Sequence, residues 1–479
     1  MSNKDKNNQS NFDTALFGLL LDRGLASNLQ TQLIEALQKV FSGAHDFSGL
    51  RLPSSRVLAQ ELSVSRTTVV NAYDQLISEG YLTTAPGSGT FVAHHLSHLT
   101  SPVARQSIQP PPQKWVPFHS GVPDQPLFPH RVWSRHLERA WVKPTSELLG
   151  RPDPFGWYPL RKSIADHLSS WRKLECRPEQ VLITSGASEA FDIIFRGLLE
   201  PNRIAAVEDP GWPIMREALA VSGATVEPVR IDDQGLDAEQ ISTKASVAIV
   251  TPSRHYPTGI SMPLSRRSAL LSWAKRTNGL IVEDDYDSEF RYQGQPLPSL
   301  AGLDRLQRSV YLGSFSKLLS PALRIGYLVL PESRLKPARA YMSRSGARAS
   351  LIPQPALAIF MESGEFAKHL RRMRRTYAKR QASLVTELTP VSDLIDVSSD
   401  PSGMHLCVPL RRKLRRLATD ETITAQAIDA GLYVRALSAH SVLPNPPQGL
   451  ILGYAGFDEA VLAKAANKMR HMLRRMAEQ

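Results

Sequence analysis

The chain has 479 residues, of which 42% are hydrophobic and 21% are charged, a composition typical of soluble globular proteins. This length predicts two or three domains. No apolar run approaches the roughly 18–20 residues of a membrane helix, and the only two cysteines, Cys176 and Cys407, exclude a disulfide framework and a zinc cluster. The polar N-terminus shows no signal-peptide pattern, so we expect a cytoplasmic protein with neither a membrane partner nor a bound metal.

The formal net charge is +12, but it is unevenly distributed. Residues 1–92 hold seven Lys and Arg against eight Asp and Glu, whereas basic runs occupy 365–380, 411–416 and 468–475. Such runs are more often solvated helix faces or interfaces than direct DNA contacts. The net charge therefore does not by itself identify a nucleic-acid partner.

The first patterned region predicts a small helical unit with a hairpin. "NLQTQLIEALQKVFSG" (28–43) places its apolar residues on one helical face and ends at a glycine. Residues 51–80 then predict two short helices separated only by Ser63-Val64-Ser65, which leaves room for nothing but a sharp turn. "YLTTAPGSGTFV" (81–92) predicts two short strands around a Gly-rich turn.

The second of these short helices has the properties of a DNA-reading helix. Ser65 can cap its N-terminus, and its apolar face leaves Arg66, Thr67 and Thr68 exposed on the first turn. In a helix-turn-helix, this first turn reaches base edges in the major groove, where Arg can grip guanine. The alternative is a small helical bundle with no ligand, and the predicted wing favours the DNA reader.

The segment "RLPSSRVLAQELSVSRTTVVNAYDQLISEGYL" closely resembles the DNA-binding domain of the GntR family of bacterial repressors, over nearly all of residues 26–93. The resemblance implies an α+β winged helix-turn-helix domain after an N-terminal tail, residues 1–25. It also implies contacts to double-stranded operator DNA from Arg56, Ser65, Arg66, Thr67, Thr68 and the wing tip at Gly89. Many GntR domains carry a basic residue where this chain has Val70, so one phosphate contact is expected to be absent.

Residues 94–115 lack apolar periodicity and end in three consecutive prolines, which predicts a semi-rigid linker. Beyond it, residues 116–479 alternate short apolar runs with helical patterns. The runs are "VLIT", "IAAVE", "VAIVT", "GLIVED", "SVYLG" and "GYLVL". This alternation predicts a parallel, doubly wound α/β sheet covered by helices on both faces.

Lys317, in "SFSKLLSPALRIGY", is the candidate reactive residue of this larger region. A lysine amine becomes nucleophilic when its pKa is lowered, and carbonyl cofactors recruit it as a Schiff base. If the cofactor were pyridoxal phosphate, the site would also need a phosphate cradle, a carboxylate for the pyridine nitrogen and a stacked aromatic ring.

Candidates for all three groups are present. In "VLITSGASEAFDIIF" a strand runs through Gly186, Ala187 and Ser188 into a helix N-terminus, whose amides suit a phosphate; Arg324 and Ser314 would complete the cradle. Asp284 is the natural partner of the pyridine nitrogen, Tyr286 could bond the ring 3-oxygen, and Trp212 could stack on the ring. Each signal alone is weak, but together they stand at successive strand ends of one sheet, where ligands of α/β sheets collect.

This set resembles the fold-type I aminotransferases over essentially residues 115–479. The matching segments are "DPFGWYPLR", "TSGASEA", "EDPGWP", "TPSRHYPTG", "VEDDYD" and "SFSKLLSPALRIGY". The resemblance implies an α/β fold-type I aminotransferase-like domain that binds pyridoxal phosphate. It makes Lys317 the catalytic Schiff-base lysine, Asp284 and Tyr286 the partners of the ring, Arg324 and Ser314 phosphate ligands, and Trp212 the stacking aromatic.

Two departures from the aminotransferase pattern stand out. Tyr256 occupies the slot of an Asn that aminotransferases place beside the 3-oxygen. Aminotransferases also supply an Arg from a late strand to bind the substrate α-carboxylate, and "QGLILGYAGF" (448–457) has none. Arg435 is the nearest arginine upstream, and the sequence leaves open whether it reaches the site.

A GntR domain, a tether and an aminotransferase-like domain together resemble the MocR/GabR subfamily of transcriptional regulators. The resemblance implies a homodimeric regulator that senses an amine, an amino acid or pyridoxal phosphate itself, with at most weak transaminase activity. The alternatives are a working aminotransferase with a DNA-binding appendage and a scaffold without cofactor.

Overall fold

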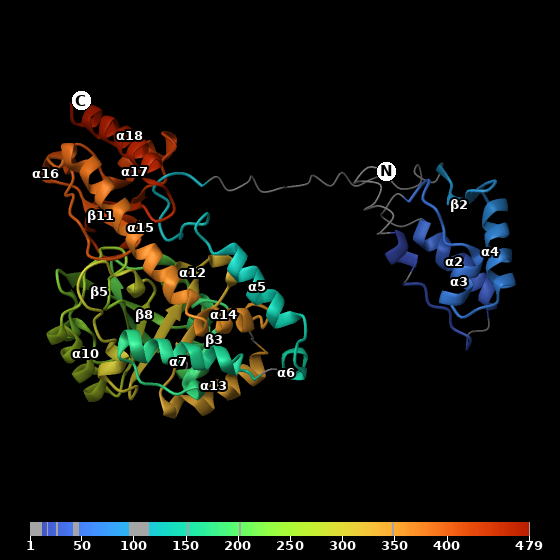
Figure 1. Ribbon diagram of the computed structural model, residues 1–479, viewed down its shortest axis with the longest axis horizontal. Coiled ribbons are helices and arrows are strands. Elements are labelled where there is room, and N and C mark those ends of the chain that lie inside the picture. Colours follow the sequence, from blue (N-terminus) through green and yellow to red (C-terminus); the bar gives the residue numbers. More distant parts are fainter. Residues whose placement is uncertain are drawn as a thin grey trace. The chain divides into compact units, whose positions relative to one another are not determined.

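The computed structural model describes residues 12–16, 18–24, 27–41, 47–94, 115–150, 153–200, 203–346 and 349–478. The chain divides into two compact units, Met1–Gln113 and Lys114–Gln479, which are shown in Figure 1 and considered separately. The expected linker, residues 94–115, lies outside the described residues apart from its two ends.

The smaller unit packs helices against a two-stranded hairpin. Its elements are α2 (Leu29–Phe41), α3 (Ser55–Glu61), α4 (Arg66–Ser78), β1 (Leu82–Ala85) and β2 (Gly89–Val92). The α2 helix packs on α4 through Leu33 and Leu37, which are fully buried. The α3 and α4 helices begin at Ser54 and Ser65, whose side chains accept hydrogen bonds from backbone amides of the first turn. The observed order is that of a winged helix-turn-helix.

Residues before the first predicted helix also contribute to this core. Phe12, Leu16 and Leu19 are buried with the apolar faces of α2 and α4, and the Phe12 ring lies 5.0 Å from that of Phe47. Sequence analysis expected only a tail before residue 26. The missed signal is a short apolar spacing at 12, 16 and 19, a single helical face that is too brief to stand out in a polar segment.

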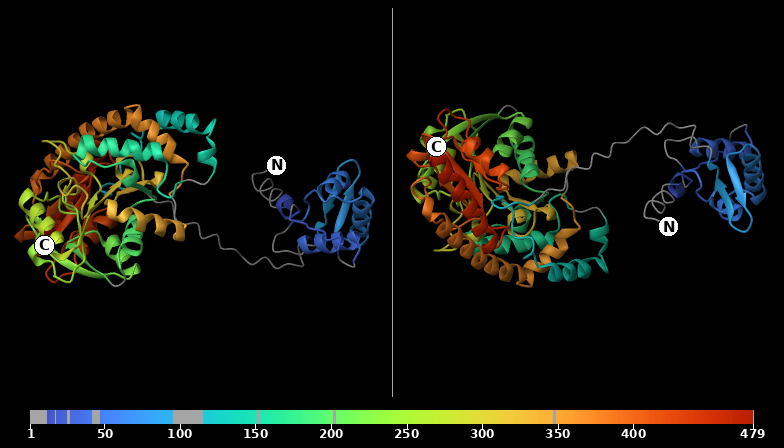
Figure 2. Two further views of the ribbon diagram at one scale, coloured as in Figure 1. Left: turned by 90° about the horizontal axis from the view of Figure 1, so that it is seen from below. Right: turned by 90° about the horizontal axis from the view of Figure 1, so that it is seen from above.

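The larger unit is built on a mixed sheet with helices on both faces. Among the described residues, this sheet has eight strands in the order β3-β10-β9-β8-β7-β4-β5-β6. The strands are β3 (Val181–Thr184), β4 (Ile204–Asp209), β5 (Thr225–Asp232), β6 (Gly235–Leu236), β7 (Val247–Val250), β8 (Leu280–Asp285), β9 (Ser309–Ser314) and β10 (Gly326–Val329). Both views in Figure 2 show the sheet enclosed by helices. Strands β3, β4, β7 and β8 carry continuous apolar runs because both faces of the sheet are covered.

The expectation of a fully parallel sheet is wrong at two strands. β10 runs antiparallel to both β3 and β9, and β6 runs antiparallel to β5. The physical reason at β10 is the short connection between Ser314 and Gly326, which cannot hold a crossover helix of ordinary length. This return has a functional consequence, because it brings Lys317 and Arg324 to the edge of the sheet where its parallel strands end.

Helices cover the two faces of the sheet, and the last part of the chain forms a subdomain. The longer helices are α5 (His130–Trp141), α7 (Tyr158–Arg172), α9 (Pro213–Val221), α10 (Leu264–Thr277), α13 (Glu332–Ser345), α14 (Pro353–Glu362), α15 (Glu365–Leu388), α17 (Asp420–Asp429) and α18 (Glu459–Glu478). A second sheet, β11 (His405–Pro409), β13 (Gly449–Gly453) and β12 (Arg435–Ala436), is antiparallel. Figure 1 shows β11, α17 and α18 together at one end of this unit. None of the helices in the described residues is long and apolar enough to cross a membrane.

Candidate functional site

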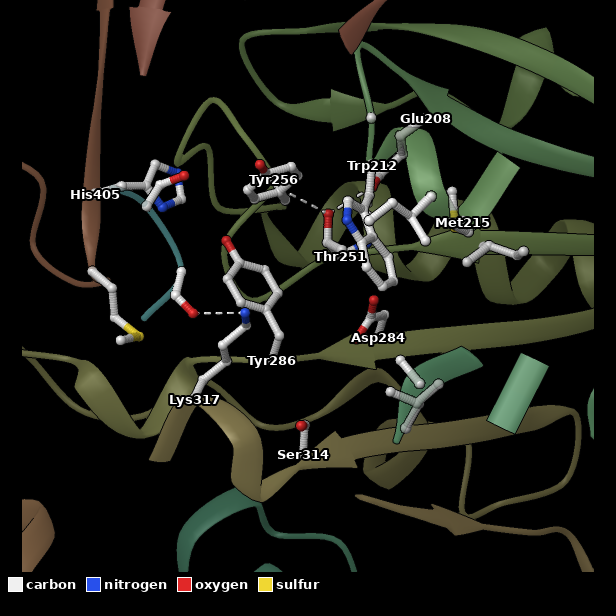
Figure 3. Close-up of a pocket in the computed structure, with 18 of the residues that line it drawn as sticks. Glu208, Trp212, Met215, Thr251, Tyr256, Asp284, Tyr286, Ser314, Lys317 and His405 are labelled. Atoms are coloured by element: carbon white, nitrogen blue, oxygen red, sulfur yellow. Dashed lines mark hydrogen bonds between the residues drawn. The ribbon is translucent and has the colours of Figure 1, made fainter. Parts of the chain in front are cut away.

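A cavity of about 320 Å³ opens at the carboxyl end of the central sheet, and Figure 3 shows its labelled side chains. Four neighbouring parallel strands each deliver a lining residue at or just beyond their ends: Trp212 after β4, Thr251 after β7, Asp284 in β8 and Ser314 in β9. Parallel strands end at the same edge of a sheet, so residues scattered over about 100 positions converge there. The predicted residues Ala187, Trp212, Tyr256, Asp284, Tyr286, Ser314 and Lys317 all line this cavity.

Lys317 extends into the cavity from the short helix α12 (Phe315–Leu318). Its Nζ donates a hydrogen bond to the carbonyl oxygen of Gly121 at 2.7 Å (Figure 3). Burial lowers the pKa of this amine below its ordinary value, Arg435 lowers it further, and the carboxylates of Asp287 and Asp284 oppose the shift. A lysine whose charged form is disfavoured is available as a neutral nucleophile.

Asp284 and Tyr286 come from the carboxyl end of β8 and the residues after it. Burial raises the pKa of Asp284 to about 7, with Asp285 adding to the shift and Lys317 opposing it. Burial also raises the pKa of the Tyr286 phenol well above its ordinary value. A buried carboxyl group becomes a strong acceptor when a cation is placed against it, as a protonated pyridine nitrogen would be.

A cradle for an anion forms beside the cavity. Gly186 adopts a φ of 134°, a conformation that favours glycine, and caps α8 (Ala187–Asp192), whose first amides are free of intrahelical partners. A Cβ at Gly186 would lie 3.9 Å from Nη1 of Arg324, so the guanidinium and the helix start are neighbours. Arg324 and Ser188 are exposed and lie at the margin rather than in the cavity lining.

The donor set fits pyridoxal phosphate. The cavity offers an amine of lowered pKa at Lys317, a carboxyl at Asp284 and an aromatic ring at Trp212, while the cradle at Gly186 and Arg324 suits a phosphate. Lys317 and Arg324 stand on the single connection between β9 and β10, so one loop can hold both ends of the cofactor.

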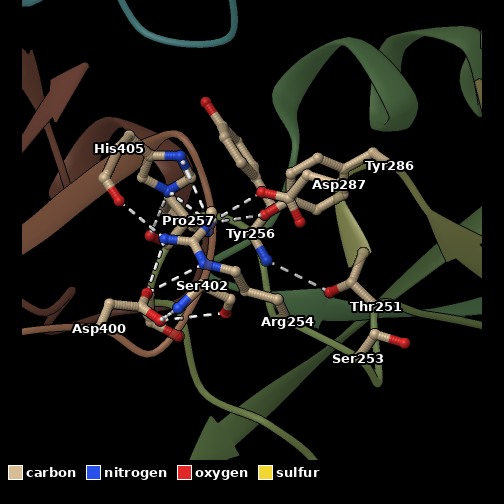
Figure 4. A network of polar contacts seen from close by, with 12 residues as sticks. Thr251, Ser253, Arg254, Tyr256, Pro257, Tyr286, Asp287, Asp400, Ser402 and His405 are labelled. Atoms are coloured by element: carbon tan, nitrogen blue, oxygen red, sulfur yellow. Dashed lines mark hydrogen bonds and ion pairs between the residues drawn. The ribbon is translucent and has the colours of Figure 1, made fainter. Parts of the chain in front are cut away.

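Sequence reasoning missed a buried polar network around Arg254, shown in Figure 4. The Arg254 guanidinium donates to Asp400 at 2.8 and 2.9 Å, to the carbonyl oxygen of His405 at 2.7 Å and to the Tyr286 hydroxyl at 3.1 Å. It also pairs with Asp287 at 3.3 Å. The network therefore ties the loops after β7 and β8 to the small sheet, and it positions the Tyr286 hydroxyl. "TPSRHYPTG" contains Arg254, but no sequence signal indicates its partners near residue 400.

Glu208 is a second buried acid that sequence reasoning did not single out. Its carboxylate accepts hydrogen bonds from the amide and hydroxyl of Thr251, at 3.0 and 2.6 Å. Burial raises its pKa to about 8 despite these bonds, so the group is largely neutral at pH 7. Its placement at the penultimate residue of β4 was a readable signal, because acids at strand ends face ligand sites.

The structure places Tyr256 and Arg435, the residues that concern the two departures of the sequence from the aminotransferase pattern. Tyr256 lines the cavity, and its ring packs edge-on against Tyr286 with 5.9 Å between centroids. Its hydroxyl lies 3.3 Å from Nε2 of His440. Arg435, on β12, also lines the cavity. The question that the sequence left open is therefore resolved, since this arginine does reach the site.

In the smaller unit, the predicted DNA-reading residues belong to α3, to the start of α4 and to the hairpin. Arg56, Ser65, Arg66, Thr67 and Gly89 are exposed, and Thr68 is half-buried. The Ser65 hydroxyl accepts from the amide of Thr68 at 3.1 Å, which makes it a helix cap as well as a candidate contact. Arg66 makes one long hydrogen bond of 3.4 Å to Ser55 and is otherwise available to a ligand.

Both units match described protein families. Residues 31–92 match "Bacterial regulatory proteins, gntR family", and residues 113–469 match "Aminotransferase class I and II".

Similar curated proteins span nearly the whole chain. The probable rhizopine catabolism regulatory protein MocR of Rhizobium meliloti is 36% identical, over 94% of this chain and 95% of that protein. The HTH-type pyridoxine biosynthesis transcriptional regulator PdxR of Corynebacterium glutamicum is 35% identical, over 91% and 94%.

Among solved structures, an archaeal alanine:glyoxylate aminotransferase matches with a TM-score of 0.69 and 22% identity, over 76% of this chain and 91% of that one. The α-aminoadipate aminotransferase LysN of Thermus thermophilus matches with a TM-score of 0.67 and 24% identity, over 75% and 92%. At these identities the likeness concerns the fold.

Proposed function

This chain belongs to the MocR-type transcriptional regulators, which join a gntR-type helix-turn-helix to an aminotransferase-like domain. From that premise we propose that it is a pyridoxal-phosphate-dependent regulator. Its effector is an amine, an amino acid or the cofactor itself. The observation that carries the proposal is the Lys317 amine, buried with a lowered pKa in a cavity that also offers Asp284 and Trp212.

In the proposed site, the residues of this chain hold the cofactor at three places. Lys317 stands at the reactive end, Asp284 would accept from the pyridine nitrogen and Tyr286 would donate to the ring 3-oxygen. Ser314, Arg324 and the amides after Gly186 would hold the phosphate, with Trp212 against the ring and Tyr256 on the side of the 3-oxygen. When bound, pyridoxal phosphate supplies an aldehyde carbon at which a ligand's primary amine can replace the lysine amine.

The proposed DNA reader is the winged helix-turn-helix at residues 26–93, joined through a tether at 94–115 to the effector domain at 116–479. Arg56, Ser65, Arg66, Thr67, Thr68 and Gly89 would meet operator DNA. We propose a cytoplasmic homodimer, so that two readers meet two half-sites. An effector that changes the affinity for DNA must itself bind with different affinity when DNA is present.

Titration of fluorescent promoter DNA with the purified protein tests this function. We expect a yellow protein whose DNA affinity changes when pyridoxal phosphate or an amine is added. The relative named for pyridoxine biosynthesis supports including the cofactor among the candidate effectors. A colourless protein that takes up no pyridoxal phosphate would refute the proposal. Turnover of amino donors well above that of Lys317→Ala would instead support a working aminotransferase.

A further inference from the structure

The hairpin of the smaller unit has no charged side chain of its own. Its sequence, "YLTTAPGSGTFV" (81–92), contains no Lys, Arg, Asp or Glu. DNA readers contact the phosphate backbone largely through Arg and Lys, and these contacts supply much of the affinity. A positive charge at this wing can therefore come only from a neighbouring segment.

The segment before α3 supplies such a charge, because it pairs with the hairpin as a third extended edge. The amide of Val92 donates to the carbonyl oxygen of Leu50 at 3.0 Å, and the amide of Leu52 donates to that of Thr90 at 2.9 Å. Arg51 stands between these two bonds. Leu52 is buried, and successive side chains of an extended segment point to opposite faces, so the exposed Arg51 points away from the core.

The Arg51 side chain lies against the wing tip at Gly89. A Cβ at Gly89 would lie 2.9 Å from Nε and 3.3 Å from Nη2 of Arg51, so the guanidinium occupies space that any other side chain would fill. Gly89 also adopts a φ of 116°, a conformation that favours glycine. Sequence analysis expected a DNA contact at Gly89, and the structure shows that this glycine makes room for an arginine.

The wing-tip arginine also lies near the helix that is proposed to read bases. Ser55, the first residue of α3, accepts a hydrogen bond of 3.4 Å from Nε of Arg66 at the start of α4. Arg51 precedes Ser55 by only four residues, and four residues span at most about 14 Å. This separation is comparable to the roughly 12 Å width of a major groove. The Arg51 guanidinium can therefore reach a phosphate beside the groove that α4 enters.

We propose that Arg51 is a phosphate-binding residue of the DNA reader, which holds the duplex backbone at the wing while α4 meets the base edges. This inference rests on the proposed function. A guanidinium can fork onto two phosphate oxygens, and such a contact fixes register without carrying sequence information. Residues 47–94 contain three basic residues, of which Arg56 and Arg66 were recognised from their motif and Arg51 is the third.

The test compares the full-length protein with Arg51→Met, by fluorescence anisotropy on promoter and scrambled DNA over a series of salt concentrations. We expect Arg51→Met to weaken binding to both DNAs alike, by about tenfold at low salt. The slope of log K against log salt concentration should become shallower by about 0.9 for each reader bound. Arg51→Lys should keep most of the slope, because the charge remains although the fork is lost. Lys39→Met, which removes an exposed positive charge from α2, is the matched control and should leave the slope unchanged.

Gly89→Ala tests whether the arginine needs the space at the wing tip. The added Cβ should displace the guanidinium, so this variant should lose about as much DNA affinity as Arg51→Met. The double variant should lose no more than either single variant, because both changes remove the same contact. Additive losses would overturn the role given to Gly89.

Unchanged affinity and salt slope in Arg51→Met overturn this inference, as does a loss confined to promoter DNA, which would make Arg51 a base reader. Thermal melting of each variant identifies a loss of fold, and Arg51→Gln then carries the test. A wild-type protein that binds no DNA overturns the proposed function and this inference with it. A DNA-binding protein that is indifferent to Arg51 overturns this inference alone.

Discussion

Asp284 shows how a single residue can couple cofactor binding to pH. Its pKa of about 7 without ligand lies above its value in an unfolded chain, near 3.9, because burial disfavours the charged form. Because the pKa of Asp284 is higher in the folded chain, the group contributes its full stabilisation at pH values below its pKa in the unfolded chain. That stabilisation is lost as the pH rises through its pKa in the folded chain. Between these limits the loss is on the order of 1.4 kcal/mol per pH unit.

Asp284→Asn should therefore flatten the decline in the melting temperature of the cofactor-free protein between about pH 4 and pH 7. The same variant cannot hold the pyridine nitrogen protonated, so cofactor affinity should fall and the absorbance of the bound cofactor should shift. Melting curves across pH and spectral titrations with pyridoxal phosphate measure the two effects. If the variant keeps wild-type absorbance and affinity, the role belongs to Asp285 or Asp287.

Arg66 is the residue on which DNA specificity should depend most. Arg66→Ala should weaken binding to the chain's own promoter by about 1–3 kcal/mol and relax sequence preference, because a bidentate contact to guanine is lost. Binding curves on promoter and scrambled DNA at fixed salt measure both effects. Unchanged promoter affinity would remove Arg66 from the set of base contacts.

The residues that sequence reasoning identified share one property, which is that each stands at a strand end or a helix start within a short motif. Asp284, Trp212 and Lys317 are readable in this way. Arg254 was missed because its importance depends on partners that only folding brings near, whereas Glu208 was missed although its place at the end of β4 was a readable signal. Arg435 was noticed but could not be placed, since its reach depends on the pairing of β12 with β13.

At the scale of elements, apolar runs predicted the buried strands well and their directions less well. β5 was missed because only one of its residues, Val229, is buried and because it contains Pro228, as a strand near the edge of a sheet can. The antiparallel direction of β10 follows from the length of a connection rather than from its composition. The short segment that contains Phe12 was missed because it gains its order from packing on α2 and α4.

Ser65 caps α4 and is also a candidate DNA contact, and two substitutions can distinguish these roles. Ser65→Ala should destabilise the smaller unit by about 1 kcal/mol, because the amide of Thr68 loses its acceptor. Ser65→Asp should preserve the cap and the stability, since Asp also caps helices and suits a helix N-terminus. Its negative charge should nevertheless weaken DNA binding, most strongly at low salt. Wild-type DNA affinity in Ser65→Asp would place Ser65 away from the phosphates.

At the scale of the whole molecule, the chain consists of two units, which we propose to act as a DNA reader and a ligand sensor. The elements α3, α4 and the hairpin form one core, and the cavity around Lys317 belongs to another. The reader has a hydrophobic core of its own, so we expect its fold not to depend on the cofactor. The two functions should therefore be separable by a change at the sensor alone.

The most direct test of the central claim is the DNA affinity of Lys317→Ala, measured by fluorescence anisotropy. It is measured with and without an amine that changes the DNA affinity of the wild-type protein. We expect a folded protein that binds promoter DNA within about threefold of wild type, lacks the absorbance of the lysine-linked cofactor and no longer responds to the amine. Pyridoxal phosphate can still enter without a covalent bond, because Arg324 and the amides after Gly186 remain. A Lys317→Ala protein that keeps a normal response to the amine would contradict the account, because the sensing site would then lie elsewhere.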